Sequence, residues 1–145
     1  MTTAMAVVVC ALGLLGRSPD SLAPIRFLEH APAGASPNVE AFVVHDPDTI
    51  YFITTAPIFR EASERQGCQA LDAVRKIASI IVHEEWHLHH GGDERGAYEA
   101  QLTALAMLGA SSPTLTTVRR SMAVAIRQQA SPHRTPELVF ARDPR

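Results

Sequence analysis

The pattern of hydrophobic and polar positions divides the chain into an early β-rich part and a later helical part. Val39–Val44 and Thr49–Ile53 are rich in Val, Ile, Phe, Tyr and Thr, and the short segment between them contains a proline. Runs of this composition on either side of a turn are typical of a β-hairpin. We therefore expect two paired strands in this region.

Capping residues divide the later part into helices. A short helix is expected between Thr55, which can cap it, and Gly67, with Pro57 in its first turn. A long helix is expected over about residues 69–90, and it ends at the two glycines 91–92.

Two further helices follow the glycines. Asp93 is a good N-cap for a helix that ends just before Gly109, and Ser111 or Ser112 caps a third helix that runs to about Gln129. Because the strands precede the helices, the pattern predicts an α+β fold in which a short β-hairpin leads into a helical core.

The chain opens with an uncharged apolar run of thirteen residues, Ala4 to Gly16. A membrane-spanning helix needs about 20 residues, whereas the apolar part of a signal peptide has about 7–15. The length therefore fits an export signal, although no Lys or Arg precedes the run. A buried N-terminal helix or strand is the alternative, and the sequence does not choose between the two.

The length of the chain predicts one domain. We expect a signal-like or anchoring segment and its linker in residues 1–24, the domain in residues 25–130 and a C-terminal tail in residues 131–145. Cleavage near residue 17 would mean a secreted or periplasmic protein, and otherwise we expect a cytoplasmic one. Association with a membrane is expected only through the apolar run.

Composition and charge exclude some classes of function. With 46% apolar and 19% charged residues, the chain is of the globular and not the disordered kind. Its net charge of -2, with no basic stripe, gives no electrostatic basis for binding nucleic acid. Cys10 and Cys68 can form one disulfide, but nothing in the sequence requires it.

Residues 83–87 read His-Glu-Glu-Trp-His on the predicted long helix. His83 and His87 are about 40° apart on the helix and one turn apart, so both imidazoles can reach one zinc ion. Glu84, next to the first histidine, can act as a general base toward an attacking water. The motif therefore predicts a catalytic zinc site.

The rest of the helix is compatible with that prediction. Val74, Ile81 and Leu88 lie about 140–180° from His83, so the helix would bury this side and turn the histidines toward a cleft. A purely structural amphipathic helix would have the same apolar stripe. A solvated helix end rich in His and Glu is therefore the alternative interpretation.

A catalytic zinc needs a third protein ligand. His90 would project from the same helix as the pair and would close a tetrahedron poorly, so we expect the ligand beyond the glycines. Glu94 and Asp93 are the main candidates there, since Glu99 is about 140° from the face of Glu94. Glu94 is preferred, because the N-cap role already explains Asp93 well.

The face of Glu94 carries further candidate residues. Ala97, Tyr98 and Gln101 follow Glu94 at helical spacing and share its face. Ala97 is small enough for a close approach of the two helices. Tyr98 and Gln101 can hydrogen-bond to a ligand or to an oxyanion, so Tyr98 is a candidate catalytic residue, with His90 as its alternative.

Glu85 is unusual as the third residue of the motif. A charged side chain here points about 160° away from His83, toward the apolar side of the helix. We expect Glu85 to lie at an exposed end or to pair with an arginine such as Arg119 or Arg120.

The sequences HEEWH and DERGAY together resemble the gluzincin type of zincin metallopeptidase, over about residues 38–110. The resemblance implies that zinc binds to His83 and His87 and that Glu84 is the general base. It implies that Glu94, on the following helix, is the third ligand. Small bacterial zincin-like domains are particularly similar, because they also have a short hairpin before the active-site helix. The implied function is zinc-dependent hydrolysis of peptide bonds in peptides or proteins.

Two features depart from the gluzincin pattern. Only six residues separate His87 from Glu94, which is fewer than usual. The spacing from His87 to Asp93 instead matches the metzincin pattern, but that pattern has a glycine where this chain has His90. The choice between Glu94 and Asp93 as third ligand therefore stays open.

The zincin resemblance also implies a site for the substrate. A strand at the edge of the cleft would pair with an extended peptide by strand addition, and Val39–Val44 and Thr49–Ile53 are the candidates. Two other functions compete with a peptidase. One is a catalytically silent zincin fold that binds zinc and serves as an interaction module, and the other is a metal-free helical interaction protein.

Overall fold

The α+β fold class predicted from the sequence is confirmed. The structure is a computed structural model that describes residues 2–65, 68–131 and the backbone of 139–142. Its elements, in chain order, are α1 (Thr3–Leu14), the 3-10 turn η1 (Pro19–Ser21), β1 (Ile25–Leu28), β2 (Val39–Val44), β3 (Thr49–Ile53), α2 (Pro57–Ser63), α3 (Leu71–His90), α4 (Glu94–Met107), α5 (Ser112–Gln129) and β4 (Val139–Arg142).

The sheet is built around the predicted hairpin. β2 and β3 are antiparallel, with Val44 opposite Thr49 and Ala41 opposite Phe52. The four strands lie in the order β1-β3-β2-β4, with β1 parallel to β3 and β4 antiparallel to β2. Both predicted strands are therefore confirmed, and both are internal to the sheet.

This order corrects the expectation that β2 or β3 pairs with a substrate. Each of these strands has a neighbouring strand on both sides. Their backbone N–H and C=O groups are used in the sheet, so strand addition would need one of the neighbours to leave first.

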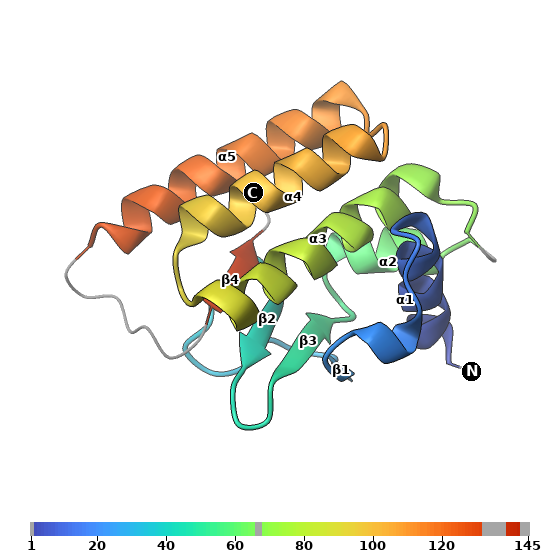
Figure 1. The fold of residues 1–145 in the computed structure, drawn as a ribbon, viewed down its shortest axis with the longest axis horizontal. Coiled ribbons are helices and arrows are strands. Elements are labelled where there is room, and N and C mark those ends of the chain that lie inside the picture. The colour runs from blue at the N-terminus through green and yellow to red at the C-terminus, as the bar shows by residue number, and fades with distance from the viewer. Residues whose placement is uncertain (1, 66–67, 132–138, 143–145) are drawn as a thin grey trace.

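α3 is the central element of the molecule. It contacts α1, α2 and α4 and the strands β2, β3 and β4. Figure 1 shows α3 running between the sheet and the antiparallel pair of α4 and α5, with α1 and α2 beside its N-terminal half. Residues on several faces of α3 are buried as a result.

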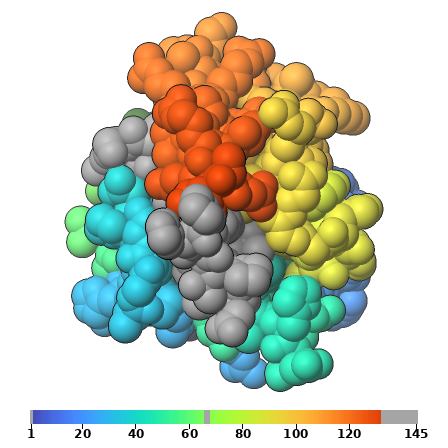
Figure 2. Space-filling view, turned by 90° about the vertical axis from the view of Figure 1, so that its left-hand side faces the viewer, coloured from blue at the N-terminus to red at the C-terminus, as the bar shows by residue number. Residues whose placement is uncertain are grey.

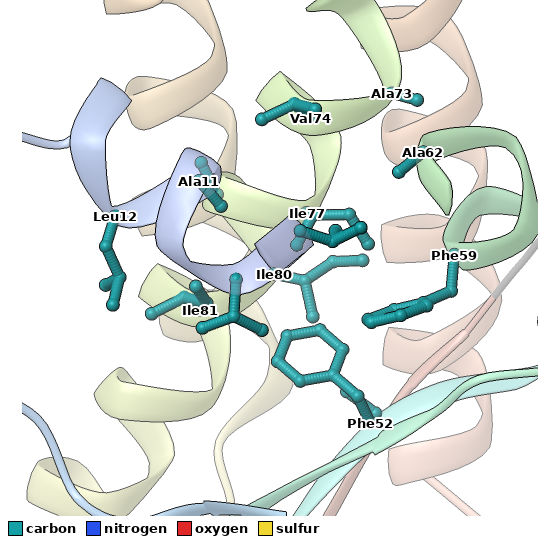
Figure 3. Close-up of a cluster of buried hydrophobic side chains, with 14 of the residues drawn as sticks. Ala11, Leu12, Phe52, Phe59, Ala62, Ala73, Val74, Ile77, Ile80 and Ile81 are labelled. Atoms are coloured by element: carbon teal, nitrogen blue, oxygen red, sulfur yellow. The ribbon is translucent and has the colours of Figure 1, made fainter. Parts of the chain in front are cut away.

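The main core lies between the sheet, α1, α2 and one face of α3 (Figure 3). Phe52 of β3 and Phe59 of α2 have ring centroids 5.7 Å apart. Ile77 and Ile81 of α3 are fully buried beside them. The apolar side of α3 is therefore directed at this core, as the helical pattern predicts. A smaller apolar cluster joins α4 to α5 through Tyr98, Leu105, Val118 and Ala125.

The predicted helix ends are largely confirmed. Gly91 follows α3 with φ 89°, a left-handed conformation that suits glycine. The Asp93 side chain caps α4 by accepting hydrogen bonds from the N–H groups of Arg95 and Gly96. Ser111 caps α5 in the same way through Thr114 N–H.

The prediction that Thr55 caps α2 is wrong. Ala56 is the N-cap, and it makes no side-chain hydrogen bond to the helix. The Thr55 hydroxyl instead donates to the carbonyl of Glu29, just after β1. Pro57 does occupy the first turn as expected, while Gly67 lies outside the described residues.

The N-terminal apolar run forms α1, which is packed into the main core. Val7, Val8, Ala11 and Leu12 are buried there, and a disulfide joins Cys10 to Cys68. No helix among the described residues has the length and apolar character needed to cross a membrane. In this structure the run adopts the folded alternative, and cleavage near residue 17 stays a prediction.

Candidate metal centre

Two histidines meet on one face of α3, as the motif predicts. The Nε2 atoms of His83 and His87 lie 3.2 Å apart, and the ring centroids lie 4.8 Å apart. Both side chains are fully buried, at 0% exposure. Their position one turn apart on a helix is what allows the two rings to converge.

Glu94 reaches the histidines from the first turn of α4. Its Oε1 is 3.1 Å from Nε2 of His87, and its Oε2 is 3.8 Å from Nε2 of His83. The ligand atoms of the three residues all lie within 4.8 Å of one another, the spacing of a group that could hold a metal ion. The turn at Gly91 brings this carboxylate back toward the helix that precedes it.

The other candidate ligands lie outside this cluster. Asp93 uses its carboxylate as the N-cap of α4. His90 is exposed and stacks on Trp86, with ring centroids 4.6 Å apart. Glu99 is exposed on α4. Of the four candidates that follow His87, the structure therefore brings only Glu94 to the two histidines.

Hydrogen bonds hold the far side of both imidazoles. Nδ1 of His87 is 2.8 Å from the carbonyl oxygen of Gly91, and Nδ1 of His83 is 2.9 Å from Oε1 of Gln101. A carbonyl only accepts, so Nδ1 of His87 carries a proton, and Nε2 is the ring atom that faces the cluster. Gln101 therefore lies next to the cluster, as its place on the face of Glu94 predicts.

Burial determines the protonation of His83. Removal from water, together with the neighbouring imidazole of His87, lowers the pKa of His83 well below 6.5. The hydrogen bond with Gln101 opposes this shift but does not outweigh it. His83 is therefore neutral near pH 7, which is the form of imidazole that binds metals.

Glu84 and Tyr98 lie in the same buried region. Glu84 is 0% exposed and follows His83 directly on α3. The ring of Tyr98 meets the ring of His83 edge-on, with centroids 4.4 Å apart. Tyr98 thus contacts a residue of the cluster, and Glu84 is buried directly after the same residue on α3, while the roles of both in catalysis stay predictions.

The end of α5 is hydrogen-bonded to the turn that leads to Glu94, and the sequence does not predict this contact. The backbone N–H of Glu94 donates to Oε1 of Gln129, and Nε2 of Gln129 donates to the carbonyl of Gly92. Figure 2 shows the face on which the end of α5 meets the turn between α3 and α4. No local signal in the sequence connects Gln129 with a turn 35 residues earlier.

The approach of α4 to α3 depends on a glycine and not only on Ala97. A Cβ atom built on Gly96 would lie 2.2 Å from Cζ2 of Trp86, far inside van der Waals contact. Trp86 is the variable residue just before the second histidine of the motif. A glycine in a helix interior is itself a signal of close packing, so this contact has a sequence signal that the predictions above do not use.

The partner of Glu85 also differs from the prediction. Glu85 forms an ion pair with Arg17, which follows α1. Arg119 and Arg120 are exposed on α5 and do not form this pair. The charge of Glu85 is thus accommodated where the end of α1 meets the side of α3 that faces away from the histidines.

Comparisons with known proteins find no relative from which the function of the candidate centre could be inferred. No protein-family model, curated protein or solved structure matches this chain. The candidate centre is therefore interpreted from the distances, burial and hydrogen bonds of its own residues.

Proposed function

We propose that this protein is a zinc-dependent metallopeptidase, in which zinc binds to His83, His87 and Glu94 and Glu84 acts as the general base. The proposal is supported by the sequence resemblance to gluzincin-type zincins and by the cluster described above. The observation that carries it is the convergence of two Nε2 atoms and one carboxylate, with ligand atoms that all lie within 4.8 Å of one another.

The spacing of the donor atoms fits a zinc ion. Ligand atoms at about 2.0–2.1 Å from a tetrahedral zinc lie about 3.3 Å from one another. The distance between the two Nε2 atoms is 3.2 Å, and that from His87 Nε2 to Glu94 Oε1 is 3.1 Å. The third distance, from His83 Nε2 to Glu94 Oε2, is longer at 3.8 Å, so the carboxylate would move closer to His83 on binding the ion. Imidazole nitrogen and carboxylate oxygen are both zinc donors, so the chemistry of the set fits as well as its size.

Each residue has a defined part in the proposed reaction. Zinc held here supplies a Lewis acid that makes water more acidic and polarises a carbonyl oxygen. The Glu84 carboxylate takes a proton from the attacking water and passes it to the leaving amine nitrogen as the peptide C–N bond breaks. Burial excludes bulk water, which strengthens the electrostatic effect of these groups on the reacting atoms.

A catalytically silent zinc-binding module is the second candidate function. The exposures of 0–1% for His83, Glu84, His87 and Glu94 favour it, because structural zinc sites are closed whereas catalytic ones keep a position open to water. The two candidates share the metal and differ only in whether hydrolysis occurs.

The first experiment is elemental analysis of protein purified without a metal-affinity tag. We expect about one zinc per chain and its loss in His83→Ala and Glu94→Ala. Removing a ligand lowers metal affinity directly, whereas Glu99→Ala, an exposed change on the same helix as Glu94, leaves the zinc content unchanged. Wild-type protein without zinc that also fails to bind added zinc would overturn both candidates.

The second experiment separates the peptidase from the silent module. Glu84→Gln keeps the size of the side chain but removes the base, so we expect zinc content as in the wild type and peptide hydrolysis reduced at least about 100-fold. Hydrolysis is measured on a quenched fluorescent peptide library, with Glu99→Gln as the matched control. A zinc-loaded wild type that cleaves no member of the library would favour the silent module.

A further inference from the structure

Ser79 lies fully buried on α3, one turn before His83. Its hydroxyl oxygen is 2.7 Å from the carbonyl oxygen of Lys76 and 3.1 Å from Nε2 of Gln101. Gln101 in turn contacts Nδ1 of His83. A continuous chain of hydrogen bonds therefore leads from a backbone carbonyl to one of the proposed zinc ligands.

The direction of this chain is fixed at its first member. The Lys76 carbonyl can only accept, so the single hydroxyl proton of Ser79 points to it. Ser79 Oγ then has only lone pairs to offer on its other side. The Gln101 atom that faces Ser79 must consequently be the NH₂ nitrogen, which is a donor.

The orientation of the Gln101 amide then determines the tautomer of His83. With its nitrogen toward Ser79, the amide turns Oε1 to Nδ1 of His83 at 2.9 Å. An amide oxygen accepts, so Nδ1 of His83 must carry the proton. Nε2 is thereby left as a lone pair, and it faces Nε2 of His87 at 3.2 Å.

We propose that Ser79 is a positioning residue that orients the Gln101 amide and so keeps Nε2 of His83 available to bind a metal ion. The role in metal binding rests on the proposed function, whereas the effect on the tautomer does not. Gln101 touches the ligand, and Ser79 acts through Gln101.

Removal of the Ser79 hydroxyl has a specific consequence. In Ser79→Ala the NH₂ group of Gln101 loses its acceptor, so the amide can rotate and present that group to Nδ1 of His83. Nδ1 would then accept, and the proton would move to Nε2, the atom that must bind the metal. Partners that orient a metal-binding histidine contribute about 10–100-fold to metal affinity, and we expect a loss of this size.

The tautomer can be measured on the metal-free full-length protein. Long-range ¹H–¹⁵N correlation spectra distinguish protonated from unprotonated ring nitrogens in a neutral imidazole. We expect His83 to carry its proton on Nδ1 in the wild type and to show an increased population with the proton on Nε2 in Ser79→Ala. An Nδ1-protonated His83 in both proteins would overturn the proposal.

Zinc affinity, measured by competition with a chromophoric chelator, provides the second readout. We expect Ser79→Ala and Gln101→Met to weaken zinc binding by about 10–100-fold. The double variant Ser79→Ala/Gln101→Glu should regain most of the affinity, because a carboxylate presents an acceptor to Nδ1 in either orientation. A double variant as weak as Ser79→Ala would contradict the role of the amide orientation.

A buried serine away from the site provides the matched control. The Ser121 hydroxyl donates to the carbonyl of Thr117 within α5, and the residue is 3% exposed. Ser121→Ala removes a similar bond and should change neither the tautomer of His83 nor zinc affinity. If Ser121→Ala weakens zinc binding as much as Ser79→Ala, the effect is a general loss of packing and the proposal fails.

The tautomer of His83 and the zinc affinity together distinguish failure of the positioning role of Ser79 from failure of the metallopeptidase proposal. If the tautomer shifts in Ser79→Ala but no variant binds zinc, the metallopeptidase proposal fails and the positioning role stands. If the wild type and Ser79→Ala bind zinc equally tightly, the positioning role fails and the zinc site stands.

Discussion

Backbone carbonyl groups determine the hydrogen-bonding roles of the two buried histidines. His87 donates directly to the carbonyl of Gly91, and His83 is connected to the carbonyl of Lys76 through two side chains. Buried polar groups without partners would destabilise the fold. Because both carbonyls belong to α3 and the residue that ends it, the helix that supplies the histidines also orients them.

Gly96 provides the first prediction at the scale of a residue. Gly96→Ala introduces a methyl group that would lie 2.2 Å from the Trp86 ring, so either this ring or α4 must shift. We expect a loss of about 1–3 kcal/mol in the free energy of unfolding, measured with urea. Since the chain contains a single tryptophan, its fluorescence should also change and report the displaced ring.

Gly13→Ala is the matched control for Gly96→Ala. Gly13 also lies in a helix, but an added Cβ meets no atom within 4 Å. Alanine there should leave stability unchanged or raise it by up to about 1 kcal/mol, since alanine is the better helix former. Equal stability of Gly96→Ala and the wild type would show that the two helices can accommodate the methyl group.

The residues of the candidate metal centre were predictable at this scale, but the residues that support them were only partly so. His83, Glu84 and His87 follow from a motif, and Glu94 follows from the glycines that precede it. Gln101 follows from helical spacing. Ser79, Gln129 and the Trp86 contact of Gly96 depend on which helices pack together, and no periodicity within one helix contains that information.

At the scale of elements, Asp72 connects the first turn of α3 to the start of α5. Its carboxylate accepts hydrogen bonds from the backbone N–H of Ser111 and from the hydroxyl of Thr114. Burial raises the pKa of the Asp72 carboxyl, but the hydrogen bonds from Thr114 and Ser111 outweigh this effect and hold that pKa below 3.8.

This connection predicts a pH dependence of stability. Because the pKa of Asp72 is lower in the folded protein than in the unfolded chain, its carboxylate stabilises the fold fully at pH values well above 3.8. The contribution is lost as the pH falls through the lowered pKa of the folded state. Asp72→Asn should therefore cost about 1 kcal/mol at pH 7 and less at pH 3, where the pH is already below 3.8.

Urea unfolding of the wild type and Asp72→Asn at both pH values tests this prediction. Asp20→Asn, an exposed change in η1, should match the wild type throughout. The same difference in stability between the wild type and Asp72→Asn at both pH values would show that the charge of Asp72 does not stabilise the junction of α3 and α5.

Elements with strong local signals were predictable, and elements held by distant partners were not. Composition alone predicts the hairpin of β2 and β3. Single capping residues, Asp93 and Ser111, predict the starts of α4 and α5. β1 is only four residues long, and β4 lies in the segment expected to be a tail. Both become strands by pairing with the edges of the hairpin, and this depends on the tertiary fold.

At the scale of the whole molecule, the centre depends on segments from both halves of the chain. α3 carries two of the proposed ligands, α4 carries the third, and the end of α5 is hydrogen-bonded to the turn between them. On the opposite side α1 and α2 hold the N-terminal half of α3 through the main core. Weakening the packing of α1 should therefore lower the stability of the whole protein. The geometry of the proposed ligands should change least, because they lie at the other end of α3.

The disulfide makes this arrangement testable. Cys10 and Cys68 are 58 residues apart in sequence, and closing a loop of that length restricts the unfolded chain by about 4 kcal/mol in the chain-entropy model. We expect Cys10→Ala/Cys68→Ala to lose about 2–4 kcal/mol in free energy of unfolding. The loss should be seen in urea unfolding, and in hydrogen exchange the amides of α1 should lose more protection than those of α4.

Addition of a reductant provides the internal control for the disulfide. It should lower the stability of the wild type to near that of the double variant and leave the double variant unchanged. Zinc affinity should differ little between the oxidised wild type and the double variant. The disulfide joins α1 to the segment before α3, whereas the proposed ligands lie at the far end of α3 and the start of α4. A large loss of zinc affinity on reduction would instead mean that α1 contributes directly to the geometry of the centre, for example through the ion pair of Arg17 with Glu85.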